Sequence, residues 1–551
     1  MMANMNTLTS FLAEFCGEHL LEEKTFIVPS YQLGHQIGEV LTSKGHSWVN
    51  LRFATLPSLA QSIAGVELSK LNIRQISGAA SLFMVDKIFR ILKEEGKLDY
   101  FGELEASSGV IRAVHRSLLD LRMAGLGSRD LSPESFIRED KGEEVILFLQ
   151  KYEEELEKRK LIDLAGLYSF ALEKAENISN GEGKIFLCFQ DKVLRRVEQN
   201  FLEKIAGENL VLVSQDPVYG LQRPRRYWKK GTGTFFLSEK RASSHLAPHR
   251  PHSAPQSDLE RMPWLFSPQD ALPPFKDKSL ELFRAVGPTN ECREILRRII
   301  YEKLSLDDVE IIHPPGNTYS SLFFVLSAKT GLKVTYADGV SLGFTSHGKV
   351  FNGLLNWLEG NFLVSELCHM IESRALRFQR EKGGEVPSPL KISRHLKNAM
   401  IGWDRNRYIP CLKARRASIE KDIRVSQEEG EEEKITRYKA DIGEIEWLIK
   451  KIKQFLELMP SWDEEGRLDF GLLCKGVSGF VKKFSRVQNE LDREALSVLS
   501  SRLEETASVE SSLLDKEEAF EWLRSLGDGI RVGASGPAPG HLHLSSRNSG
   551  G

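Results

Sequence analysis

The stretch TFIVPSYQLGHQIGEVL, residues 25–41, joins a short apolar run to a helical pattern, and this pairing decides the fold class. Residues 25–29 are nearly all apolar and end in turn formers, which is typical of a strand buried on both faces of a parallel sheet. Residues 32–41 repeat apolar side chains at helical spacing. A strand followed by a helix predicts one repeating unit of an α/β fold.

Similar apolar runs continue along the first half of the chain. They are VNLRFAT (49–55), KIFLCF (184–189) and LVLVS (210–214). Residues 77–176, which lie between the first two of these runs, are helical in period and offer no strand. We therefore predict a first α/β lobe over residues 1–219, with an all-helical insertion at about 70–176.

The composition changes after the first lobe. Residues 220–279 are rich in proline and basic side chains and cannot build a core, which predicts a linker or surface loop. Strand patterns return at LFRAV (282–286), VEIIH (309–313) and KVTY (333–336), with helical patterns between them. These patterns predict the amino-terminal part of a second α/β lobe over residues 280–362.

A second helical insertion is predicted over residues 363–530. Apolar residues recur there at three-, four- and seven-residue steps around the acidic turn 428–433, which predicts an antiparallel helical hairpin over 412–455. The run HLHLS (541–545) then predicts a strand with nothing after it to cover it. We expect residues 531–551 to begin a returning lobe, and the sequence to be the front part of a longer protein.

Composition excludes several classes of protein. With 75 basic and 77 acidic residues the formal net charge is -2, so any nucleic-acid contact must come from local patches. The six cysteines are scattered and form no C-x-x-C pair, which disfavours a zinc or iron-sulfur site and fits a cytoplasmic setting. No apolar run is long enough to span a membrane, and the amino terminus lacks the basic start of a signal peptide.

Several stretches resemble one branch of the superfamily 1 helicases. They are FIVPSYQLGHQIGEVL (26–41), ATLPSLAQSIA (54–64), SGVIRAVHRSLLDLRMAGLGSRDL (108–131), YEEELEKRKLID (152–163), TNECREILRRI (289–299) and DDVEIIHPPGNTYSSLF (307–323). In pattern and order, over nearly its whole length, the chain is similar to the AddB-type subunit of bacterial helicase-nucleases. That subunit is an inactivated superfamily 1 helicase fused to a RecB-like nuclease.

The resemblance implies an α/β fold of two P-loop-NTPase-like (RecA-like) parallel-sheet lobes with large all-helical insertions. It also implies a role in DNA double-strand-break repair and recombination, beside an AddA-type helicase-nuclease subunit, within a complex that is a hydrolase. The family's PD-(D/E)XK nuclease domain uses magnesium, and this domain and the cysteines of the family's iron-sulfur cluster would lie beyond Gly551. We therefore expect no cofactor, metal or catalytic residue in this chain.

The sequence lacks the parts of a working ATPase. A motor needs a glycine-rich phosphate loop beside its first strand and an acidic pair at the end of a later strand. The first strand has no such loop, and the strand at 184–189 ends in Gln190 and Asp191. One near-match, GFTSHGK at 343–349, has Val350 where the hydroxyl should be, and the sequence leaves open whether it binds phosphate.

Two loops carry the predicted DNA contacts. In the resembled family the loops after the first-lobe strands face single-stranded DNA. On this chain those loops hold Ser30, Tyr31, Gln32, Thr55, Ser58 and Gln61. The tyrosine suits base stacking and the hydroxyls suit phosphate contacts, but Ser30 and Thr55 are equally well placed to cap the helices that follow. The basic and aromatic segment 223–230 fits a solvated linker better than a phosphate track.

Three functions remain open from the sequence. The first is a non-motor DNA-binding subunit that grips a DNA end or single strand and guides it to a nuclease. The second is an ATP-dependent DNA helicase with divergent motifs, and the third is a protein-only scaffold. The missing phosphate loop disfavours the second, and the paired lobes disfavour the third, because a scaffold has no need of two such sheets.

Overall fold

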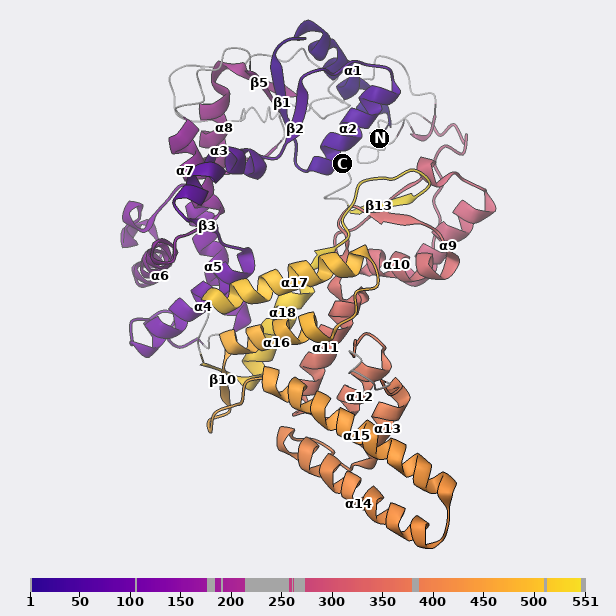
Figure 1. Cartoon of the computed structure of the whole chain (residues 1–551). Helices are drawn as coiled ribbons and strands as arrows, with labels where there is room; N and C mark the ends of the chain where they lie inside the picture. The colour runs from indigo at the N-terminus through magenta and orange to yellow at the C-terminus, as the bar shows by residue number, and fades with distance from the viewer. Residues whose placement is uncertain are drawn as a thin grey trace.

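The chain is a mixed α/β protein with two larger parallel sheets, of four and three strands, and a large helical body (Figure 1). The computed structural model describes residues 2–104, 107–175, 184–189, 192–213, 257–259, 261, 273–378, 386–509 and 513–546. Each sheet is interrupted in sequence by a long run of helices, as predicted. We call the two sheets with their covering helices the first and second α/β units.

The first sheet has four parallel strands in the order β2-β1-β5-β6. Their bounds are Glu23–Ile27 for β1, Leu51–Ala54 for β2, Lys184–Phe189 for β5 and Leu210–Val213 for β6. All three pairings are parallel and without interruption. The four predicted strands are confirmed, with ends shifted by one or two residues.

Helices cover both faces of the first sheet. One face carries α1 (Met2–Glu18) and α2 (Tyr31–Ser43), and the other carries α3 (Leu56–Lys70), α7 (Leu164–Lys174) and α8 (Arg196–Ala206). Phe26 packs toward the first face and Ile27 toward the second, because successive side chains of a strand point in opposite directions. Burial on both sides explains why these strands are continuous apolar runs.

The first helical insertion consists of α4 (Gly78–Glu94), α5 (Ser108–Met123) and α6 (Glu139–Lys158). The prediction that this interval contains no strand was wrong. Two-residue strands, β3 (Arg74–Gln75) and β4 (Leu161–Ile162), pair in parallel at the base of the insertion. Such short strands carry no alternating pattern, so periodicity does not reveal them.

The region before the second sheet departs from prediction in one respect. Of the predicted linker 220–279, only 257–259, 261 and 273–279 lie within the described residues. The strand predicted at 282–286 is absent: this segment is irregular, and Leu282 is 101% and Val286 85% exposed. Apolar alternation alone does not make a strand where no neighbouring strand pairs with it.

The second sheet has three parallel strands in the order β7-β13-β8. They are β7 (Glu310–His313), β8 (Val334–Tyr336) and β13 (Leu542–Ser546), with α9 (Pro288–Tyr301) before β7 and α10 (Thr318–Thr330) between β7 and β8. These elements confirm the predicted strands and helices. The expectation that β13 would stay uncovered was wrong, because β13 is the central strand and all five of its residues are buried.

A second run of helices separates β8 from β13. It comprises α11 (Ser346–Glu359), α12 (Val364–Glu372), α13 (Pro389–Asn398), α14 (Tyr408–Glu428), α15 (Glu432–Leu458), α16 (Phe470–Phe484), α17 (Glu490–Val509) and α18 (Lys516–Asp528). The predicted hairpin is confirmed as α14 and α15, which extend away from the rest of the molecule (Figure 1).

Short strands also occur in and around this second run of helices. They are β9 (Val340–Ser341), which pairs with β12 (Arg531–Val532), and β10 (Arg467–Asp469), which pairs with β11 (Leu513–Asp515). Both pairs are antiparallel. The prediction of unbroken helix in this region was therefore wrong at β10 and β11.

The two helical insertions share one hydrophobic core. Phe83 of α4 lies with its ring centroid 5.1 Å from that of Phe470 in α16 and 4.5 Å from that of Trp522 in α18. The backbone N–H of Ser77, which caps α4, donates to a carboxylate oxygen of Glu505 in α17 at 2.7 Å. The insertions thus form a single helical body that connects the two α/β units (Figure 1).

Candidate nucleic-acid interface

The loop after β1 lies at a topological switch point of the first sheet. The connection from β1 passes over one face through α2, and the connection from β5 passes over the opposite face through α8. In open α/β sheets, ligands usually bind outside the carboxyl ends of two neighbouring strands that diverge in this way. The predicted contact residues Ser30 and Tyr31 therefore lie at the usual ligand position. Gln190 and Asp191, which follow β5, lie outside the described residues.

Three of the predicted contact residues cap helices. The side chain of Ser30 accepts the backbone N–H of Leu33 at 3.3 Å at the start of α2. Thr55 and Ser58 form a reciprocal capping box at the start of α3, with distances of 3.3 and 3.1 Å between the side chain of each and the backbone nitrogen of the other. The capping interpretation that the sequence left open therefore holds for Ser30 and Thr55, and the capping role of Ser58 is an addition from the structure. A DNA contact by these three residues stays a prediction.

The side chains of Tyr31 and Gln61 are exposed, whereas the side chain of Gln32 is not described. Tyr31 is 51% exposed at the first position of α2, so its ring is available to a ligand. Gln61 is exposed on α3. Gln32 belongs to α2, but its side chain lies outside the described residues, as does the basic segment 223–230.

A groove brings residues of both predicted loops together. It has a volume of about 560 Å³ and lies on the face of the first sheet that carries α3 and α8. Thr25, Ala54 and Phe186 line it from the sheet, and Tyr31 and Ser58 line it from the two loops. Ligand sites commonly enclose roughly 300–1,000 Å³, so the groove has the size of a binding site. Sequence reasoning missed it because its lining comes from elements far apart in the chain.

Charged side chains surround the groove. Arg52, Lys184 and Lys204 line it together with Glu23 and Glu208. Arg52 pairs with Glu23 at 3.0 Å, yet its side chain remains 74% exposed. Three cations against two carboxylates give a modest positive local charge. A local patch of this sign is what phosphate contact requires in a chain of nearly zero net charge.

The near-match to a phosphate loop is a packed helix start. Its residues form a 3-10 turn and the first turn of α11, where the Ser346 N–H donates to Asp492 at 2.8 Å and the Gly348 N–H donates to the Thr345 hydroxyl at 3.0 Å. A Cβ atom at Gly348 would lie 1.9 Å from the carbonyl oxygen of Leu342. The amides that would cradle a phosphate are thus used within the protein, which opposes phosphate binding here.

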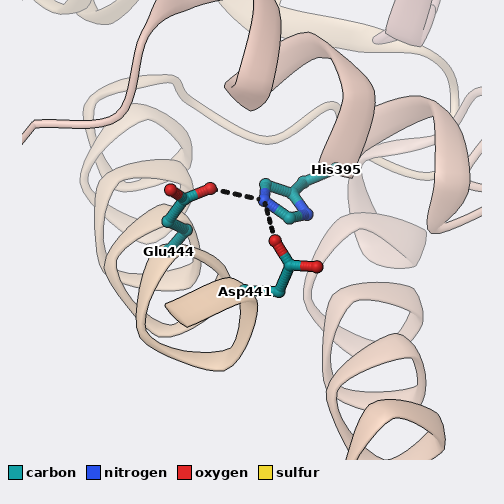
Figure 2. Close-up of side chains that lie close together, drawn as sticks. All are labelled: His395, Asp441 and Glu444. Carbon is teal, nitrogen blue, oxygen red and sulfur yellow. Dashed lines mark hydrogen bonds and ion pairs between the residues drawn. The ribbon is translucent and has the colours of Figure 1, made fainter. Parts of the chain in front are cut away.

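A second polar cluster lies between α13 and α15 (Figure 2). Figure 2 shows the Nε2 atom of His395 facing both carboxylates, at 2.8 Å from Glu444 and 3.8 Å from Asp441. Lys391 lies 2.6 Å from the other oxygen of Glu444, and Arg394 lies 3.4 Å from Asp441. Because each carboxylate already has a cationic partner, the cluster is a set of ion pairs that fastens α13 to α15. The three-residue spacing of Asp441 and Glu444 on α15 is visible in the sequence. The sequence does not show that His395 of α13 lies beside them.

The electrostatics of this cluster agree with ion pairing. Partial burial raises the pKa of Glu444, but the hydrogen bonds from Lys391 and His395 outweigh this effect and hold its pKa below the ordinary value. The glutamate therefore stays ionised at neutral pH and keeps its ion pair with Lys391.

The described residues do not fit the iron-sulfur cluster or the magnesium site that the resemblance implies for a nuclease domain. The six cysteines are all unpaired thiols, and they lie in separate elements. Among the residues that the structure describes, the His395 cluster is the one group of three or more histidine, cysteine or acidic side chains with the spacing of metal ligands.

Comparisons with known proteins do not identify the chain. No protein-family model matches it, and no curated protein matches its sequence. Among the described helices, none has both the length and the apolar character needed to cross a bilayer.

Proposed function

We propose that this chain is the non-motor, helicase-fold DNA-binding part of a double-strand-break-processing helicase-nuclease subunit of the AddB type. In this proposal the two α/β units are RecA-like lobes. The first unit holds a DNA end or single strand and guides it to a nuclease domain, beside an AddA-type subunit in the cytoplasm. The function would serve DNA repair and recombination.

The observation that carries the proposal is the groove on the first sheet. Tyr31 and Ser58 come from the two loops for which the sequence predicts DNA contact, and they line the same groove. Cationic side chains lie around it, among them Arg52 and Lys184. An exposed aromatic ring beside cations is the combination with which proteins hold single strands, because the ring stacks on bases while the cations meet phosphates.

Two further observations support a non-motor role. The amides of the near-match to a phosphate loop are engaged by Asp492 and Thr345, so they are not available to a nucleotide. The two helical insertions also share a core around Phe83. A motor that opens and closes its two lobes in each cycle would have to shear or break this core, because packed cores deform poorly.

Fluorescence anisotropy with a labelled single-stranded oligonucleotide tests the proposal. We expect the chain to bind the single strand at low salt and Tyr31→Ala to weaken binding about tenfold, since stacking on one aromatic ring contributes roughly 1–3 kcal/mol. Tyr301→Ala is the matched control, because Tyr301 is 78% exposed on α9, away from the groove. Absence of binding would refute the proposal, and ATP-dependent unwinding would favour the divergent helicase.

A further inference from the structure

The groove extends well beyond the two predicted loops. Tyr31 and Ser58 lie at the carboxyl ends of the strands, whereas Glu23, Lys184 and Asn209 lie at the amino ends of β1, β5 and β6. A five-residue strand is roughly 16 Å long, so the groove runs for about that distance along the side of the sheet. A ligand in this groove can therefore contact more of the sheet than a ligand bound only at the carboxyl ends of the strands.

The interior of the groove suits a planar heterocycle. Apolar side chains line it from the sheet and from α3, including Phe186, Leu59 and Ile63. Hydroxyl groups of Thr25 and Ser62 lie among them. Polar and apolar groups line the groove in similar measure, so a nucleobase would find both a surface for its ring and partners for its polar edge.

The far end of the groove carries its own cations. Lys184 and Lys204 are both exposed and line the groove near the amino ends of the strands. Glu23 and Glu208 are the acidic residues on that side, and Glu23 is paired with Arg52. Lysine side chains in this position suit the phosphates of a strand whose bases enter the groove.

We infer that the groove holds unstacked bases of single-stranded nucleic acid, with their phosphates at Lys184 and Lys204. The strand then follows the side of the first sheet and does not contact the carboxyl edge alone. This inference rests on the proposed function and adds the path of the strand beyond the predicted loops. Apolar lining between α3 and α8 and cations along the groove are what select a single strand over a duplex, whose bases are not available for insertion.

A groove-filling substitution tests the inference with a matched control on the same helix. Ser62 is exposed and lines the groove, whereas Ser69 is exposed on α3 away from it. We expect Ser62→Phe to weaken binding of a labelled oligothymidine about tenfold and Ser69→Phe to change it less than twofold. Equal affinities for the two variants would overturn the inference.

The salt dependence of binding supplies a second readout that does not depend on packing. A plot of the logarithm of the binding constant against the logarithm of the salt concentration has a negative slope. Removing one lysine–phosphate interaction with a single strand reduces the magnitude of this slope by about 0.7. Lys184→Ala combined with Lys204→Ala should therefore reduce the slope by about 1.4, and Lys70→Ala on α3 should leave it unchanged. If Tyr31→Ala weakens binding but neither set of groove variants does, the groove inference fails and the proposed function stands. If the unaltered chain binds no single strand, both fail.

Discussion

Replacing Phe83 by alanine should loosen both helical insertions together. The side chain is 2% exposed, and its ring contacts Phe470 and Trp522 of the other insertion at 5.1 and 4.5 Å between centroids. Truncating a buried phenylalanine costs about 3–5 kcal/mol, because the transfer free energy of the ring is forfeited and a cavity remains. The cavity would be bordered by α4 on one side and by α16 and α18 on the other. We therefore expect faster amide hydrogen exchange in all three helices.

Hydrogen exchange measured by mass spectrometry distinguishes loosening of all three helices from loosening of α4 alone. Phe201→Ala is the control, since Phe201 is fully buried in the first α/β unit with its ring 5.5 Å from that of Tyr168. It should loosen α7 and α8 and leave α16 and α18 unchanged. If Phe83→Ala accelerates exchange in α4 alone, or lowers the free energy of unfolding by less than about 1 kcal/mol, the two insertions do not share a core.

The remaining predictions concern stability and its dependence on pH. Gly348→Ala should strongly lower the melting temperature, because its Cβ would meet a backbone oxygen at 1.9 Å, whereas Gly343→Ala, with its nearest neighbour at 3.8 Å, should be tolerated. Burial lowers the pKa of His115 from 6.5 to about 4, so the folded state keeps the imidazole neutral. Stability should then fall as the pH drops below 6.5, by about 2 kcal/mol at pH 5, and His115→Gln should remove this loss in urea titrations. Glu444→Gln should cost about 1 kcal/mol at pH 7 by breaking its ion pairs. Because the pKa of Glu444 is lowered from 4.5, that difference should disappear as the pH falls below 4.5, which unfolding at pH 7 and pH 3 measures.

Much of the fold follows from local sequence patterns. The run 184–189 is apolar because both faces of its strand are buried, and this burial made the parallel sheet predictable. The pattern at 282–286 is as apolar but lies beside no partner strand, so it stays irregular and exposed. Strand formation depends on a neighbour that can come from anywhere in the chain, and local pattern does not supply that information.

The candidate site was predictable only in part. The resemblance to superfamily 1 helicases pointed to the loops after the first-lobe strands, and hence to Tyr31 and Ser58, because strand ends are visible in the sequence. Lys184 and Lys204 resemble any solvated lysine until the fold places them beside those loops. The capping role of Thr55 was one of two open interpretations, and only the geometry of its hydrogen bonds with Ser58 distinguishes them.

The central position of β13 has a consequence for synthesis of the chain. Its Ser545 donates a hydrogen bond to Glu310, which is 235 positions earlier. At about 5–20 residues per second, a ribosome needs roughly 10–50 s to reach β13 after β7 has emerged. Throughout that interval β7 and β8 lack the strand that joins them, while α11 to α18 emerge one after another. The second α/β unit is therefore expected to be the last part to fold and the part most in need of a chaperone during translation.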